Sequence, residues 1–124
     1  MDPSRLQSFA AIFTVADVTR ALSVYVGRLG FVEQFRVGEP PSYAIIDRDN
    51  VSLHLMAGER APDNVGRSAI YVFVDNADGL HAEFIARACP IEEPPADYDY
   101  GMREFSLRDP DGNRITFGQE IPRA

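Results

Sequence analysis

The sequence has one cysteine, no tryptophan and no long apolar run. A single cysteine, Cys89, cannot form a disulfide within the chain and excludes a thiolate-rich metal site, which fits a reducing compartment. No apolar run approaches the ~18 residues that a membrane span needs, and residues 1–5 lack the basic-then-apolar layout of a signal peptide. We therefore expect a cytoplasmic protein without a membrane segment, in which Cys89 is a small buried apolar residue.

Positive charge is also scarce. Twelve Lys and Arg face 19 Asp and Glu, which gives a net charge of −7. This balance opposes binding to nucleic acid or to an anionic membrane surface and favours a cationic ligand, although it also serves solubility alone. The 124 residues, 45% of them apolar and 25% charged, have the composition of one ordinary globular domain.

Helix signals occur twice, each after an extended segment. Asp17 is a plausible N-cap before apolar residues at helical spacing, and Gly30 fits the C′ position at the end of that helix. Asp75 or Asn76 can cap the second helix, which Pro90 ends. The pattern predicts two similar helices.

Period-two alternation around these helices predicts strands. The predicted strands are Phe9–Val15, Tyr43–Asp47, Val51–Met56, Ile70–Val74, Arg103–Leu107 and Arg114–Phe117. Asp109–Asn113 has the proline and glycine of a tight turn and joins the last two strands as a hairpin.

A unit of strand, helix and strands recurs after about 60 residues, since Phe13–Asp17 resembles Val72–Asp75. The predicted fold class is α+β: a single domain, 1–124, of two βαβββ modules that form curved mixed sheets with a ligand cleft. The modules cover about residues 8–57 and 69–119, and a linker rich in turn residues spans 58–68.

Each strand divides its residues between two faces. The aliphatic set should face the helices: Phe9, Ala11, Phe13, Val15, Val51, Leu53, Leu55, Ile70, Val72, Val74, Ile115 and Phe117. The opposite set mixes aromatic, small and polar residues, among them His54, Met56, Tyr71, Phe73, Glu104 and Thr116. That mixture suits a ligand cleft. The alternative is that these faces pack against each other or against another subunit.

Two stretches resemble a known superfamily. Val15–Val18, continued by Leu29-Gly30-Phe31, looks like the opening of vicinal-oxygen-chelate proteins, which include glyoxalase I, extradiol dioxygenases and bleomycin-resistance proteins. Gly101–Phe105, followed by Arg108–Asn113, is similar to the G-x-R-E-F…D-P-x-G-N pattern of the glyoxalase/bleomycin-resistance branch. The resemblance extends from about Phe9 to Gln119 and implies the same fold.

Metal-dependent members of that superfamily place ligands on the first and last strands of the two modules. The matching positions here are Ala10, His54, Ala69 and Thr116. Since alanine has no donor atom, only His54 can bind a metal, and Glu104 is the one carboxylate expected near it. Without a metal, isomerisation and ring cleavage of the superfamily's kind lose their electrophile. We therefore expect no metal and no cofactor.

The resemblance then points to the metal-free bleomycin-resistance proteins, which sequester a cationic drug in clefts between two subunits. It implies a homodimer that binds a small, cationic or aromatic molecule, with Tyr71 and Phe73 at the positions that line the cleft. From the residues themselves we expect Tyr43, His54 and Met102 to add apolar and aromatic contact, and Asp63 and Glu104 to attract a positive group. Two alternatives stay open: a glyoxalase-like enzyme that uses His54 and Glu104, and a fold that serves only dimerisation. The chain lacks the tryptophan common in drug-binding clefts, so the ligand and a role in antibiotic resistance are not assigned.

Overall fold

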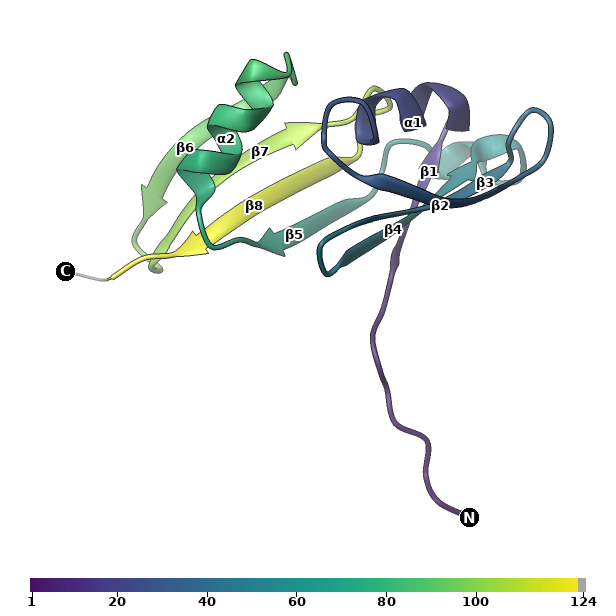
Figure 1. Ribbon diagram of the computed structural model, residues 1–124, viewed down its shortest axis with the longest axis horizontal. Helices are drawn as coiled ribbons and strands as arrows, with labels where there is room; N and C mark the ends of the chain where they lie inside the picture. Colours follow the sequence, from purple (N-terminus) through teal and green to yellow (C-terminus); the bar gives the residue numbers. More distant parts are fainter. Residues whose placement is uncertain (123–124) are drawn as a thin grey trace.

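The computed structural model describes residues 1–122, which form two four-stranded mixed sheets (Figure 1). The first module comprises β1 (Ala11–Val15), α1 (Val18–Tyr25), β2 (Val32–Val37), β3 (Tyr43–Arg48) and β4 (Val51–Ala57). The second comprises β5 (Ala69–Phe73), α2 (Ala77–Ala86), β6 (Ile91–Tyr98), β7 (Met102–Arg108) and β8 (Arg114–Glu120). Two 3₁₀ turns, η1 (Gly58–Arg60) and η2 (Pro62–Asn64), lie between the modules. The predicted α+β fold of two βαβββ modules is confirmed.

Both sheets have the same topology. Their strand orders are β1-β4-β3-β2 and β5-β8-β7-β6, and in each the first strand of the module runs parallel to the last. The sheets stay open, and both helices lie on the same side of them (Figure 1). Within residues 1–122, the faces away from the helices are therefore not covered by a helix. Neither helix in residues 1–122 is long and apolar enough to cross a membrane.

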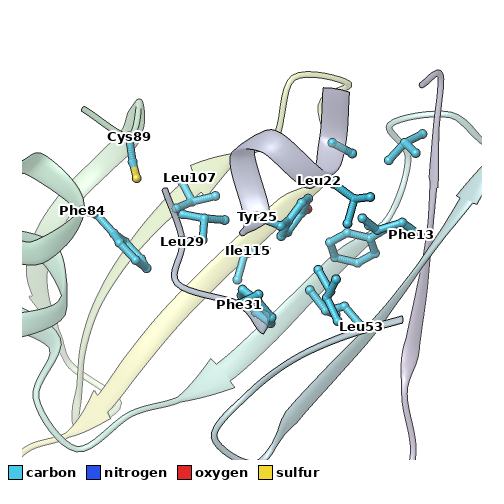
Figure 2. Close-up of a cluster of buried hydrophobic side chains, with 14 of the residues drawn as sticks. Phe13, Leu22, Tyr25, Leu29, Phe31, Leu53, Phe84, Cys89, Leu107 and Ile115 are labelled. Carbon is cyan, nitrogen blue, oxygen red and sulfur yellow. The ribbon is translucent and has the colours of Figure 1, made fainter. Parts of the chain in front are cut away.

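The core lies between each helix and its sheet (Figure 2). Phe13 and Leu53 of the first sheet are at most 1% exposed, and Tyr25 of α1 packs edge-on against Phe13 with ring centroids 6.3 Å apart. The predicted helix-facing residues of β4 and β8 are buried or packed against this core. Cys89 is also buried, as expected.

The helix caps follow the sequence signals, but the helix ends differ. Asp17 accepts a hydrogen bond from the backbone N–H of Arg20, and Asn76, one of the two candidate caps, accepts from Gly79. Helix α1 ends at Tyr25 and not next to Gly30, because the chain leaves the helix in tight turns that bond Phe31 back to Tyr25. Gly30 has a φ of +78°, so it does supply a left-handed turn, several residues after the helix.

The predicted start of the first strand is wrong. Strand β1 begins at Ala11, and Phe9, expected among the helix-facing residues, is 87% exposed. Residues 1–10 extend away from both sheets (Figure 1). The strand prediction from the sequence also missed β2 and β6. Both lie at sheet edges and are largely exposed, so neither shows a clean alternation.

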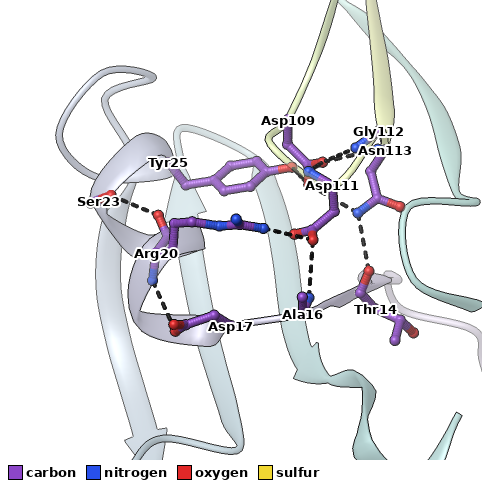
Figure 3. A network of polar contacts seen from close by, with 10 residues as sticks. All are labelled: Thr14, Ala16, Asp17, Arg20, Ser23, Tyr25, Asp109, Asp111, Gly112 and Asn113. Carbon is purple, nitrogen blue, oxygen red and sulfur yellow. Dashed lines mark hydrogen bonds and ion pairs between the residues drawn. The ribbon is translucent and has the colours of Figure 1, made fainter. Parts of the chain in front are cut away.

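A polar network ties the second module to α1 (Figure 3). Asp109, in the turn between β7 and β8, accepts the hydroxyl hydrogen bond of Tyr25 at 3.0 Å, and both groups are buried. Asn113 donates from its side chain to the carbonyl of Thr14 at 3.2 Å. Arg20 pairs with Asp111 at 2.9 Å. The predicted hairpin turn is confirmed, and it also positions the two modules relative to each other.

Candidate functional site

A recess opens on the second sheet, on the face away from α2. It has a volume of about 540 Å³ and is lined by Tyr71, Phe73, Tyr100, Met102, Glu104, Arg114 and Thr116. Four of the predicted ligand-binding residues, Tyr71, Phe73, Met102 and Glu104, therefore meet at one place. Strand parity explains this, because the facing positions of β5, β7 and β8 lie on one side of the sheet.

Glu104 is the polar centre of the recess. The hydroxyl of Tyr71 donates to its Oε2 at 2.7 Å, and the hydroxyl of Tyr100 donates to its Oε1 at 2.6 Å. Burial, and then the hydrogen bond to Glu104, raise the pKa of Tyr71. The hydrogen bond to Glu104 raises the pKa of Tyr100 to about 12. Both phenols thus stay protonated at neutral pH and hold the carboxylate in a fixed orientation.

Gly118 makes this arrangement possible. It lies on β8 between Phe73 of β5 and Glu104 of β7, with which it is in register. A Cβ atom at Gly118 would lie 1.8 Å from the Tyr71 hydroxyl oxygen. The Tyr71 side chain therefore crosses β8 over the missing side chain to reach Glu104. The sequence-based site omitted Gly118 and Tyr100, although a glycine inside a strand is a signal of close approach.

Aromatic rings form the walls of the recess. Phe73 is 79% exposed, and its ring centroid lies 5.1 Å from that of Tyr71. Tyr98 and Tyr100 stack at 5.4 Å with an interplanar angle of 11°. Exposed rings of this kind offer stacking and cation–π contacts to a flat ligand.

Among the described residues that line the recess, Arg114 is the cationic one. Its Nη2 donates to Glu93 at 3.2 Å and to the hydroxyl of Ser106 at 3.4 Å. Its Nε is buried and has no hydrogen-bond partner within residues 1–122. Because Glu93 already shares the guanidinium charge, Glu104 is the carboxylate best placed to attract a cation.

The other predicted site residues do not line this recess. Tyr43 and His54 lie on the first sheet, where the Tyr43 hydroxyl is 2.7 Å from Nδ1 of His54. Asp63 lies exposed in η2, and it neither lines the recess nor belongs to the Tyr43–His54 pair. The alternative enzyme needs His54 and Glu104 to act on one substrate, and the recess around Glu104 does not include His54. That alternative stays a prediction.

The residues at the superfamily's metal positions do not fit a metal centre. Within residues 1–122, no three His, Cys, Asp or Glu side chains gather closely enough to hold an ion. Ala10 and Ala69 supply no donor atom, and Thr116 supplies only a neutral hydroxyl. His54 is bonded to Tyr43 instead. No step of a metal-dependent mechanism can be derived from these side chains, and metal independence stays a prediction.

A second pocket, of about 530 Å³, lies between the modules. Its lining combines core-packed aliphatic residues with the ion pair of Arg48 on β3 and Glu83 on α2. Two hydrogen bonds, of 2.8 and 3.0 Å, join these side chains, and Arg48 also donates to the carbonyl of Leu29. Arg48 and Glu83 thus pair with each other across the module boundary, and Asp49, Asn50, Asp75 and Asn76 also line this pocket.

Comparison with known proteins gives the family. The model of the Glyoxalase/Bleomycin resistance protein/Dioxygenase superfamily matches residues 5–117. No curated protein matches the sequence. The bleomycin-binding protein of bleomycin-producing Streptomyces verticillus, solved with copper(II)-bleomycin, is 27% identical, with a TM-score of 0.77 and coverage of 98% of this chain and 100% of that one.

Two further solved structures share the fold. TioX from Micromonospora sp. ML1 is 20% identical, with a TM-score of 0.80 and coverage of 93% of this chain and 100% of that one. Lactoylglutathione lyase from Agrobacterium tumefaciens is 18% identical, with a TM-score of 0.76 and coverage of 94% and 96%. Since the family model matches most of its length, the chain belongs to the glyoxalase/bleomycin resistance protein/dioxygenase superfamily.

Proposed function

We propose that the protein binds and sequesters a flat, cationic aromatic molecule, in the manner of a bleomycin-resistance protein and without a metal. The observation that carries this proposal is the recess in which two tyrosine hydroxyls hold the Glu104 carboxylate beside the exposed ring of Phe73. A flat ligand stacks on the rings, and its positive group faces the carboxylate. The net charge of −7 adds long-range attraction for a cation.

The similarity to the bleomycin-binding protein supports a ligand of this class. That protein was solved with copper(II)-bleomycin, and the present chain shares its fold over almost the full length of both. The lactoylglutathione lyase has the same fold, so the fold by itself does not choose between binding and catalysis. The side chains of the recess support binding, because they supply stacking surface and charge.

We further propose that a second copy of this chain covers the recess. Large apolar side chains remain exposed on the faces away from the helices, including Ile12, Phe35 and Val37 of the first sheet and Phe73 of the second. Exposed large apolar side chains on one face of a sheet favour an interface. Because the modules share one topology, a two-fold dimer that sets the first sheet of each copy over the second sheet of the other covers both faces and makes two equal clefts.

Titration tests the ligand class. Copper(II)-bleomycin and N-methylquinolinium are each added to the purified protein, and binding is followed by calorimetry and tyrosine fluorescence. We expect at least one of them to bind, with an affinity that falls as salt rises. Failure of both cations to bind at low salt would refute the proposed function.

Two variants locate the site, each with a matched control. Glu104→Gln removes the charge and should weaken binding roughly fivefold to twentyfold, as expected for a partly exposed charge pair. The control Glu59→Gln removes an equal charge from the exposed turn η1 and should have no such effect. Phe73→Ala should weaken binding about tenfold, whereas Ile85→Ala, at an exposed position of α2, should not.

Sedimentation equilibrium tests the dimer. The wild-type protein should sediment as a dimer, and Phe35→Glu should shift it toward monomer by placing a charge on the proposed interface. Ile85→Glu places the same charge on the helix side and should leave the dimer unchanged. A monomeric wild type at all concentrations would contradict the assembly but not the recess.

A further inference from the structure

His54 lies in the middle of β4, on the face away from the helices. Its register partners are Ile12 on β1 and Ile45 on β3. The neighbours along its own strand, Leu53 and Leu55, point into the core. The imidazole is half-buried among aliphatic side chains and contacts one polar group, the hydroxyl of Tyr43.

The contact with Tyr43 is short. The hydroxyl oxygen lies 2.7 Å from Nδ1, and the two rings meet edge to face, at 81° with centroids 5.4 Å apart. A distance of 2.7 Å is typical of an O–H donor, whereas N–H donors favour about 2.9–3.0 Å. The distance therefore favours the phenol as the donor and Nδ1 as the acceptor.

This bond determines the proton on the opposite edge of the ring. A neutral imidazole has one N–H and one lone pair. If Nδ1 accepts from Tyr43, the proton of the neutral ring is on Nε2. Within residues 1–122 no hydrogen bond is formed by Nε2. In this state His54 offers a donor and has no free lone pair with which to accept a proton or bind a metal.

We infer that Tyr43 holds His54 as the Nε2–H tautomer and that this N–H donates to a carbonyl oxygen of the bound ligand. A neutral carbonyl, as in an amide or ketone, fits better than a carboxylate because the protein is acidic and the flanking residues Ile12 and Ile45 supply no positive charge. The inference rests on the proposed function. It adds a specificity-determining residue on the first sheet, which the proposed dimer sets opposite the recess.

Nitrogen NMR tests the tautomer without any ligand. Long-range proton–nitrogen correlation on histidine-labelled protein, in an alkaline buffer in which free imidazole is neutral, distinguishes protonated from unprotonated ring nitrogens. The chain has only two histidines, so His81 is an internal reference. We expect His54 protonated at Nε2 in the wild type and a mixture of tautomers in Tyr43→Phe. A proton on Nδ1 in the wild type would overturn the inference.

A matched pair of probes tests recognition of the carbonyl. N-methylquinolinium and its carboxamide derivative are titrated against the wild type, His54→Leu and His54→Gln, after circular dichroism has shown that each variant is folded. We expect the carboxamide to bind the wild type roughly fivefold to tenfold more tightly, the increment of one hydrogen bond. His54→Leu should remove that advantage, while His54→Gln, which keeps an N–H, should retain part of it.

The two arms separate the possible failures. Equal affinity of the two probes for the wild type overturns donation by His54 while the proposed function stands. If neither probe binds, recognition of the carbonyl fails together with the proposed function, and the tautomer is still decided by the NMR spectrum.

Discussion

Replacing Tyr25 with phenylalanine removes one oxygen from the network that joins the modules (Figure 3). The Tyr25 hydroxyl is buried and donates to Oδ2 of Asp109 across the boundary between α1 and the β7–β8 turn. The substitution keeps the ring and its edge-to-face contacts with Phe13 and Phe31. The change in stability therefore reports the hydrogen bond and not the packing.

The expected loss of stability depends on which hydrogen bonds Asp109 keeps in the variant. A hydrogen bond to a charged group contributes about 1.5–3 kcal/mol. Oδ2 of Asp109 keeps a second donor, the Asn113 side chain at 2.9 Å, so we expect Tyr25→Phe to cost about 2 kcal/mol, near the lower end. For a chain of this length the midpoint of thermal unfolding then falls by roughly 6–10 °C.

Asp109→Ala should cost more, because Asp109 accepts more than the Tyr25 bond. Its Oδ1 accepts three backbone N–H bonds, from Asp111, Gly112 and Asn113, each at 2.9 Å. Removing the carboxylate leaves the N–H groups of Asp111 and Asn113 and the Tyr25 hydroxyl without this acceptor, and Gly112 keeps only the carbonyl of residue 109, at 3.0 Å. At about 1 kcal/mol for each group, the expected loss is roughly 4–5 kcal/mol.

Urea unfolding of both single variants and the double variant measures the coupling between the two side chains. The double-mutant cycle should give an interaction energy of about 1–2 kcal/mol. A loss below about 0.5 kcal/mol in Tyr25→Phe, together with a coupling near zero, would refute the argument that this bond holds the modules together.

Three further outcomes are expected. Gly118→Ala should displace the Tyr71 ring, weaken cation binding at least as much as loss of the carboxylate does, and lower the high pKa of that tyrosine in a spectroscopic titration. Arg48→Met should cost about 1 kcal/mol in urea unfolding, because its partly buried, doubly hydrogen-bonded pair with Glu83 crosses the module boundary. Burial and the Asp109 charge raise the pKa of Tyr25, so this phenol stays protonated in the folded state. In the unfolded state it ionises above about pH 10, and the free energy of unfolding should therefore fall as the pH rises above that value. In Tyr25→Phe this fall should be less steep by about 1.4 kcal/mol per pH unit.

The fold was accessible from the sequence where local chemistry and burial agree. The cap at Asp17 and the Asp109–Asn113 turn are held by hydrogen bonds between residues a few positions apart, so the local sequence is enough to predict them. Strands β2 and β6 gave no such signal. Each is an edge strand paired on one side only and exposed along most of its length. Exposed edge strands are rich in charged residues and proline. They therefore lack the alternation of apolar and polar residues by which strands are recognised in a sequence.

The candidate site was accessible only in part. Strand parity placed Tyr71, Phe73 and Glu104 on one face, and the structure brings these residues together. Parity does not indicate which side chains cross a strand. The path of Tyr71 over Gly118 depends on the register of three strands, and no local pattern in the sequence contains that register.

The Tyr25–Asp109 network and the proposed ligand cleft are connected through geometry. The recess around Glu104 lies wholly on the second sheet, whereas Tyr43 and His54 lie on the first. In the proposed dimer one copy must present both sheets to its partner at once, so the angle between its modules decides whether both clefts close. The buried bond of Tyr25 to Asp109 is one of the contacts that fix this angle. A variant that loosens it should therefore weaken dimerisation and ligand binding together, although it touches neither the interface nor the recess.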